Sequence, residues 1–217
     1  MAFTMDPMTY KTLYARFFSR GTQPQEFLYL VSGVKDKVVL DLCCGNGRIT
    51  KLCKEAKAVY AVDESLSMTK DIQKAANLDI LTASVSSALV LLLEKNVKAD
   101  VVFCQQAINY WFSEVNIQAL SKIMAPGSFF IFNTFNTKPE PIPKVNEYTL
   151  EGKEYVEVSW SVNETIHHVQ CCTGSAPHTT EFSWISPYRF RAILEPYFTV
   201  TEIKKGKSSV YCCQRNG

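Results

Sequence analysis

The chain has 217 residues, of which 47% are hydrophobic and 20% are charged, and its formal net charge is +2. This size and composition suit one soluble α/β domain with a well-covered core. A net charge so close to zero, without a dense stripe of Lys and Arg, argues against a nucleic-acid partner. No apolar run is long enough to span a bilayer, and Met1–Met8 lacks the apolar core of a signal peptide. We therefore expect a cytoplasmic protein that has no membrane partner.

Eight cysteines are present, and six of them form adjacent doublets. Paired zinc ligands are normally separated by about two to four residues, so the doublets argue against a metal site. The doublets lie within apolar strand patterns or in a small-residue loop, where a thiol serves as a small side chain. We therefore expect reduced thiols and no metal.

The N-terminal residues 1–35 are predicted to form a helical cover. Apolar and aromatic side chains recur at spacings of three and four positions between Tyr10 and Phe18, which is typical of an amphipathic helix. Gly21 interrupts this pattern, and Pro24 starts a second short helix that ends at about Val31.

Residues 36–135 alternate between short apolar runs and segments of helical periodicity. The predicted strands are residues 38–42, 58–62, 79–83, 100–104 and 129–133. The predicted helices are residues 48–55, the segment from Ser65 or Ser67 to Ala75, residues 86–96 and residues 115–124. Strands that alternate with helices in this rhythm predict a doubly wound parallel sheet.

The pattern changes after Asn136. Three prolines mark residues 138–144 as a loop. The alternating segments 155–160 and 165–171 predict an antiparallel hairpin, and residues 179–184 are a candidate third strand. We expect residues 138–185 to be an inserted β-hairpin block that covers the acceptor side of a functional site. A sheet extension or a dimer face is the alternative interpretation.

Residues 186–217 are predicted to close the chain with a helix and a second hairpin. Ser186 is a suitable N-cap, and Pro187 is a suitable first residue for a helix that ends at Leu194. Strands are predicted at residues 198–203 and 208–213. Because no linker interrupts the chain, we expect a single domain over residues 1–217.

The segment from Asp41 to Gly47 is the most informative part of the sequence. An acid in a buried strand is followed by a small-residue turn that contains Gly45 and Gly47, and then by a helical pattern. A second acid, Asp63, stands 22 positions after Asp41 and ends the next strand. This order predicts a nucleoside-binding unit, because small residues let a ligand approach the backbone at the carboxyl ends of parallel strands.

Five segments in this order resemble the motifs of class I (Rossmann-like) S-adenosylmethionine-dependent methyltransferases of the small-molecule type. They are residues 41–47, 61–65, 83–85, 100–110 and 124–128. Two positions depart from the family pattern: Cys43 replaces the first glycine of the loop, and Ser84 replaces an acid. The resemblance implies a mostly parallel seven-stranded α/β sheet with an antiparallel C-terminal hairpin.

The resemblance also implies S-adenosyl-L-methionine as the cofactor, with S-adenosyl-L-homocysteine as its product. Asp63 is expected to accept hydrogen bonds from both ribose hydroxyls. Asp41 is expected to orient the loop or to accept from the cofactor's ammonium group. The full set of expected cofactor residues is Asp41, Cys43, Gly45, Asn46, Gly47, Asp63, Glu64, Met68, Ser84, Val85, Cys104, Gln105 and Tyr14.

Two regions are candidates for the acceptor site. Asn109, Tyr110 and Trp111 follow the fourth strand and are expected to face the methyl group, unless they start a helix that packs on the sheet. The inserted block is the other candidate, because it combines aromatic and polar residues.

All three histidines lie in the inserted block. His167 and His168 are adjacent, so they point to opposite faces of a strand and at most one of them faces the site. His178 and Glu181 are close enough in sequence to form an oriented base. The candidate catalytic residues are His178, His168 and Tyr110, with a structural or surface role as the alternative.

The predicted function is transfer of a methyl group from S-adenosylmethionine to N or O of a small polar or aromatic molecule, by a monomer or homodimer. One alternative is a non-catalytic protein of the same fold that binds the cofactor or a partner. An NAD-dependent oxidoreductase is another, but a pyrophosphate favours a third glycine at the helix start, and residues 48–50 offer none.

Overall fold

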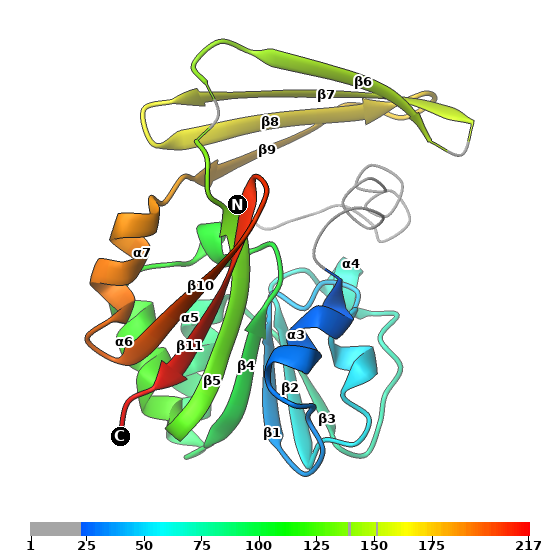
Figure 1. Cartoon of the computed structure of the whole chain (residues 1–217). Coiled ribbons are helices and arrows are strands. Elements are labelled where there is room, and N and C mark those ends of the chain that lie inside the picture. Colours follow the sequence, from blue (N-terminus) through cyan, green and yellow to red (C-terminus); the bar gives the residue numbers. More distant parts are fainter. Residues whose placement is uncertain (1–22, 139, 151) are drawn as a thin grey trace.

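The computed structural model describes residues 23–138, 140–150 and 152–217, and in these residues the chain forms two β-sheets (Figure 1). The larger sheet has seven strands and the smaller has four. The predicted helix between Tyr10 and Phe18, which includes Tyr14, lies outside the described residues.

The seven-stranded sheet has the order β10-β11-β5-β4-β1-β2-β3. Its central pairs are parallel, and β11 is antiparallel to both β5 and β10. The strands are β1 (Val38–Leu42), β2 (Ala58–Asp63), β3 (Leu78–Thr82), β4 (Ala99–Cys104), β5 (Met124–Phe135), β10 (Phe198–Lys205) and β11 (Ser208–Arg215). Chain order reverses between β1 and β4, which confirms the predicted doubly wound sheet and its antiparallel C-terminal hairpin.

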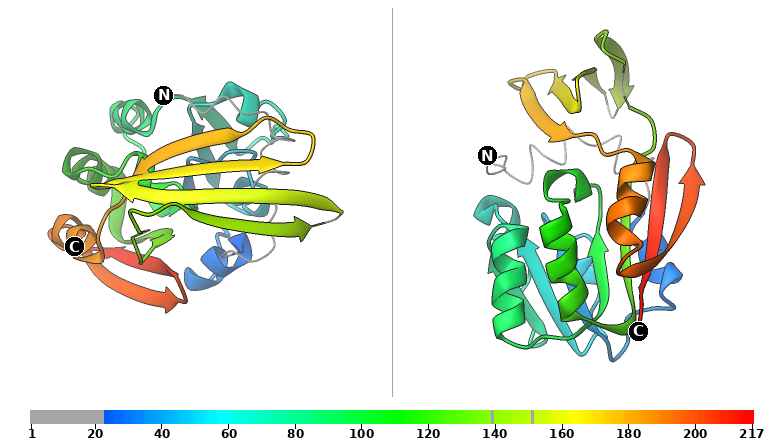
Figure 2. Two further views of the ribbon diagram at one scale, coloured as in Figure 1. Left: turned by 90° about the horizontal axis from the view of Figure 1, so that it is seen from above. Right: turned by 90° about the vertical axis from the view of Figure 1, so that its left-hand side faces the viewer.

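Three helices cover one face of this sheet, as the right-hand view of Figure 2 shows. They are α5 (Val85–Glu94), α6 (Glu114–Ile123) and α7 (Pro187–Leu194). Leu89, Ile117 and Phe190 bring one fully buried side chain from each helix into a common core with the sheet. The helix α7 has the predicted bounds, and Ser186 caps it by accepting a hydrogen bond from the backbone nitrogen of Arg189.

The opposite face of the sheet takes α3 (Pro24–Leu30), the predicted second short helix. Its Phe27 is fully buried, and the ring lies 6.2 Å from that of Phe103 on β4 in an edge-on arrangement. This contact holds α3 against β4.

The predicted helix over residues 48–55 is wrong, because only the short 3-10 turn η1 (Thr50–Leu52) forms there. The backbone N–H of Thr50 donates to the carboxylate of Asp41 at 3.0 Å. The backbone nitrogens of Leu52 and Cys53 donate to the carbonyls of Ile49 and Thr50, three positions earlier, at 2.8 and 3.0 Å, which is the 3-10 pattern of hydrogen bonds.

The helix predicted to continue to Ala75 is also shorter, because α4 ends early (Leu66–Thr69). Ser65 occupies the N-cap position, but its hydroxyl lies 2.8 Å from that of Ser67 and does not cap the backbone. The remaining chain to β3 follows turns.

The smaller sheet, named here the cover sheet, is antiparallel and has the order β6-β7-β8-β9. Its strands are β6 (Lys144–Leu150), β7 (Lys153–Val162), β8 (Thr165–Cys172) and β9 (His178–Ser183). The predicted hairpin and candidate third strand are confirmed, and β6 is an additional edge strand. The cover sheet lies across the end of the large sheet at which β5 finishes (Figure 1).

One side chain ties the cover sheet to the core. Asn109, in the turn η2 (Ile108–Tyr110), donates from Nδ2 to the carbonyl of Ser183 at 2.8 Å. Its Oδ1 accepts a hydrogen bond from Oγ1 of Thr134 on β5, also at 2.8 Å. The end of β9 is thereby held against the segment that follows β4.

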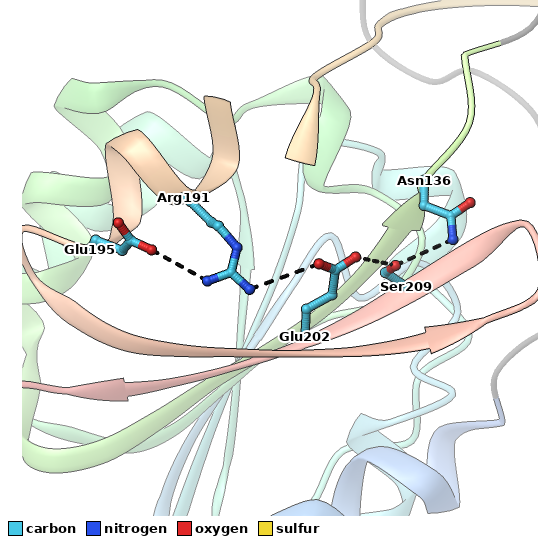
Figure 3. Close-up of polar contacts among 5 residues, drawn as sticks. All are labelled: Asn136, Arg191, Glu195, Glu202 and Ser209. Carbon is cyan, nitrogen blue, oxygen red and sulfur yellow. Dashed lines mark hydrogen bonds and ion pairs between the residues drawn. The ribbon is translucent and has the colours of Figure 1, made fainter. Parts of the chain in front are cut away.

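A polar network joins the two places where the chain leaves and re-enters the core (Figure 3). Asn136 follows β5 and donates to Oγ of Ser209, which in turn donates to Glu202 at 2.7 Å. Arg191 of α7 lies 3.9 Å from Glu202 and 3.3 Å from Glu195.

Among the helices of the described residues, none is long and apolar enough to cross a membrane.

Candidate cofactor cleft and acceptor face

The loop after β1 has an unusual backbone. Cys43, Gly45 and Gly47 have φ values of 55°, 54° and 76°, in the left-handed region. A Cβ atom on Gly47 would lie 3.2 Å from Ile72, and one on Gly45 would lie 3.4 Å from Cε of Met68. Met68 is buried, so it supports the loop from below. The glycines are therefore required by the backbone conformation and by close packing.

Asp63 holds this loop in place from the end of β2. Its Oδ2 accepts a hydrogen bond from the backbone nitrogen of Gly45 at 2.8 Å, and its Oδ1 accepts from that of Ser65 at 2.9 Å. Burial raises the pKa of the Asp63 carboxyl, and these two hydrogen bonds oppose the rise. Each carboxylate oxygen has a second lone pair, so both can also accept from a ligand.

Asp41 lies deeper than Asp63 and bonds to Thr50. Its Oδ2 accepts from the backbone nitrogen at 3.0 Å and from the hydroxyl at 2.6 Å. Burial raises the pKa of Asp41 to about 7, with a smaller contribution from the charge of Asp63. This geometry fixes the far end of the glycine loop, which is one of the two roles expected for Asp41.

A cleft opens between the β1 loop and the exit from β4, where the strand order reverses. It is lined by Asp41, Cys43, Cys44, Gly45, Asn46, Arg48, Ile49, Gln105 and Gln106. Five expected cofactor residues are among them, whereas Cys44, Arg48, Ile49 and Gln106 are additional. Ligands of open α/β sheets bind at this position.

The thiol of Cys43 lines the cleft and contacts that of Cys104. Contact with the Cys104 thiol and burial both raise the pKa of Cys43 well above its usual value. Cys104 is fully buried and accepts a hydrogen bond on Sγ from Nε1 of Trp111 at 3.4 Å. Trp111 is therefore packed in the core, in agreement with the alternative expectation that this segment packs on the sheet.

The expected adenine contacts lie along β2 and the start of α5. Glu64 is exposed. Ser84 is the N-cap of α5 and accepts from the backbone nitrogen of Ser87 at 3.2 Å, while the side chain of Val85 is buried in the core. Because the side chain of Val85 is buried, only its backbone could contact a ligand.

Above the cleft, the cover sheet presents one face toward the core. Phe182 of β9 lies on that face, and its ring is 5.7 Å from that of Tyr110, which follows β4. Tyr110 is 54% exposed. Side chains alternate along a strand, so His178 and Thr180 share the face of Phe182. We name this side of the cover sheet the inner face.

The two candidate histidines lie together on the inner face. His168 pairs with Thr180 in the register, and His178 pairs with Gln170. Burial lowers the pKa of both imidazoles, and the carboxylate of Glu157 opposes this for His168. Both rings are therefore mainly neutral at pH 7, as a proton acceptor requires.

The predicted pairing of His178 with Glu181 is wrong. Glu181 is three positions further along β9, so it lies on the opposite face, where it bonds to Nδ1 of His167 at 3.0 Å. Trp160 stacks on that imidazole, with ring centroids 5.0 Å apart. His167 thus belongs to the outer face, away from the cleft.

Residues 39–127 match the family model of a methyltransferase domain, and the strand order and C-terminal hairpin fit it. This similarity to a methyltransferase domain covers residues 39–127 only. No curated protein matches the chain by sequence.

Solved structures of methyltransferases share the fold of the whole chain. A S-adenosylmethionine-dependent methyltransferase from Clostridium acetobutylicum has a TM-score of 0.75 at 15% identity, over 97% of this chain and 99% of that chain. An amino pentose methyltransferase from Micromonospora echinaspora has a TM-score of 0.70 at 12% identity, over 100% of both chains. A sugar N-methyltransferase from Streptoalloteichus has a TM-score of 0.70 at 12% identity, over 100% of this chain and 95% of that chain.

Three polar residues of the candidate site, Arg48, Gln106 and Gln170, were not among the residues expected from the sequence, whereas Glu157 was expected among the polar residues of the inserted block. Arg48 and Gln106 flank motif residues, so inspection of each motif's neighbours would have found them. Glu157 and Gln170 lie side by side on the inner face only because β7 and β8 pair in one register.

Proposed function

We propose that the chain transfers a methyl group from S-adenosylmethionine to a nitrogen or oxygen atom of a small molecule. The observation that carries this proposal is the cleft at the β1–β4 switch point, which lies beneath a polar inner face. Two structural neighbours support the cofactor, since one is an enzyme bound to S-adenosylmethionine and another is a complex with S-adenosylhomocysteine.

The residues of the cleft, and Asp63 bonded to its Gly45, fit this cofactor chemically. Asp63 supplies a carboxylate whose remaining lone pairs suit two ribose hydroxyls. Cys43, Gly45 and Asn46 bring small side chains and backbone polar groups to the amino-acid end of the cofactor. Arg48 adds a cation that complements the cofactor's carboxylate.

The cofactor supplies an activated methyl group on a sulfonium, so the protein's task is mainly positioning and exclusion of water. The cover sheet serves both purposes, because it closes over the cleft and presents the acceptor from above. An acceptor amine or hydroxyl must lose a proton. Under this proposal His168 or His178 takes that proton, and Tyr110 lies at the edge of the same space.

Titration calorimetry with S-adenosylhomocysteine and with NAD tests the cofactor. We expect the purified chain to bind S-adenosylhomocysteine and not NAD, and binding of NAD alone would refute the proposal. Formation of S-adenosylhomocysteine from S-adenosylmethionine, measured over a panel of small amines and alcohols, tests the reaction. Cofactor binding without turnover of any of them would favour a non-catalytic role.

A further inference from the structure

Buried polar side chains form a cluster around Glu157 and Gln170 on the inner face of the cover sheet. Glu157 of β7, Gln170 of β8 and His178 of β9 are consecutive partners across three strands. Their side chains therefore lie next to one another on the same face. Glu157 is 7% exposed and Gln170 is 1% exposed, whereas His168 and His178 are more open and lie around them.

Hydrogen bonds fix the orientation of Glu157. Its Oε1 accepts from the hydroxyl of Tyr148 at 2.8 Å and from Nε2 of Gln170 at 3.2 Å. Tyr148 is itself held by stacking on Tyr155, with ring centroids 5.1 Å apart. Burial of a carboxylate costs desolvation energy, which these two hydrogen bonds offset in part.

Gln170 provides an independent observation. Because its Nε2 donates to Glu157, its Oε1 is turned elsewhere, and this buried oxygen has no hydrogen-bond partner among the described residues. Buried acceptors in proteins are nearly always satisfied, so an orphaned one indicates a missing donor. The required partner must bring an N–H or O–H group.

The charge of the cluster indicates which chemical group, a hydroxyl or an ammonium, would suit it better as a hydrogen-bond donor. Its titratable groups are Tyr148, Tyr155, Glu157, His168 and His178. Glu157 contributes a negative charge, and the two histidines are mainly neutral with one acceptor nitrogen each. A hydroxyl brings one hydrogen and no charge. An ammonium group brings several hydrogens and a positive charge, which matches a carboxylate beside an unsatisfied amide oxygen.

We propose that Glu157 and Gln170 bind an amine of the methyl acceptor, so that the acceptor is a small amine rather than an alcohol. This inference rests on the proposed function and assigns the substrate class of the same site. Glu157 forms a charge-assisted hydrogen bond to the amine, and Oε1 of Gln170 accepts a second hydrogen from it. Neither residue takes part in cofactor binding.

The experiment compares Glu157→Gln with Glu181→Gln. Glu157→Gln keeps the size of the side chain and removes its charge from the inner face. Glu181→Gln removes an equivalent charge from the outer face of the same sheet, where the carboxylate bonds to His167. A third variant, Gln170→Met, removes the orphaned oxygen at nearly constant volume.

Turnover is measured with paired probes that differ in an amine and a hydroxyl, namely glucosamine and glucose, cyclohexylamine and cyclohexanol, and aniline and phenol. We expect the amine of at least one pair to be methylated in preference to its alcohol. We expect Glu157→Gln to raise the KM for that amine about 10- to 100-fold, Gln170→Met to raise it less, and Glu181→Gln to leave it unchanged.

Binding of S-adenosylhomocysteine to each variant separates this inference from the proposed function. We expect unchanged affinity and an unchanged melting temperature in Glu157→Gln, together with a reduced preference for amine over alcohol, which a purely structural role would not produce. Failure of the wild type to bind S-adenosylhomocysteine would overturn the proposed function. Normal cofactor binding with turnover of alcohols only, or of none of the amines, would overturn the amine assignment. An equal effect of Glu157→Gln and Glu181→Gln would overturn it as well.

Discussion

The backbone nitrogen of Gly45 donates a hydrogen bond to Oδ2 of Asp63 at 2.8 Å, joining the loop after β1 to the end of β2. The same carboxylate is the group expected to bind ribose. The shape of the loop and the proposed recognition of the ribose therefore both depend on the side chain of Asp63. A useful variant weakens the contact with ribose and keeps the loop in place.

Asp63→Asn disturbs the loop less than Asp63→Ala, because its amide oxygen can still accept one of the two backbone hydrogen bonds that the carboxylate accepts. We expect about 10- to 100-fold weaker binding of S-adenosylhomocysteine in calorimetry, since charge-assisted bonds to two hydroxyls are lost. Asp71→Asn is the matched control, because Asp71 is an exposed aspartate outside the expected cofactor residues, and this variant should lose little affinity. Wild-type affinity in Asp63→Asn would remove the ribose assignment.

Gly47→Ala should destabilise the fold for two reasons. The residue has a φ of 76°, and its new Cβ would lie 3.2 Å from Ile72. We expect a loss of about 1–3 kcal/mol in the free energy of unfolding, measured by urea denaturation. Gly174→Ala is the control for backbone strain alone, because Gly174 has a φ of 83° and no described atom lies within 4 Å of the position that its new methyl group would take. Equal losses in the two variants would show that the contact with Ile72 is unimportant.

The buried carboxyl of Asp41 should make stability depend on pH. Its pKa in the folded chain is about 7, above the ordinary value of 3.8. Between these values the folded state holds more protons than the unfolded state, so this group's stabilising contribution is complete below about pH 4 and is lost as the pH rises through 7. Asp41→Asn cannot titrate. Its free energy of unfolding, measured by denaturation at several pH values, should therefore lack this decline, and parallel curves for wild type and variant would contradict the assignment.

Asn109→Asp tests the tie between the core and the cover sheet. The aspartate still accepts from Thr134 but loses the N–H that Asn109 donates to the carbonyl of Ser183. We expect faster hydrogen exchange in β9 and lower methyl transfer, with little change in affinity for S-adenosylhomocysteine. If β9 exchanges as in the wild type, the tie does not hold the cover sheet.

Local patterns predicted the core closely, and tertiary contacts explain where they failed. The bounds of β1 and α7 agree with prediction, because a buried apolar run and a Ser-Pro helix start are local signals. The predicted helix after Gly47 was wrong because the backbone there forms 3-10 hydrogen bonds, and this segment is tied to Asp41, nine positions before Thr50. No pattern in a single segment contains that information.

The acceptor side was less predictable for the same reason. The strand β6 contains charged and polar residues at its exposed edge, and it is ordered by pairing with β7 rather than by its own periodicity. Glu157 and Gln170 become neighbours only through the register of β7 and β8. By contrast, the glycine loop and Asp63 could be selected from the sequence, because each lies in a short family motif of consecutive residues.

The whole cover sheet is one uninterrupted excursion of the chain, between Asn136 after β5 and Ser186 before α7. The network from Asn136 through Glu202 to Arg191 keeps these two junctions within one rigid frame (Figure 3). Under the proposed function, a single genetic exchange of this stretch would give the domain a new substrate while leaving its cofactor cleft intact. The layout therefore favours diversification by cassette replacement, and a chimera that carries another methyltransferase's insertion at these junctions should retain its fold.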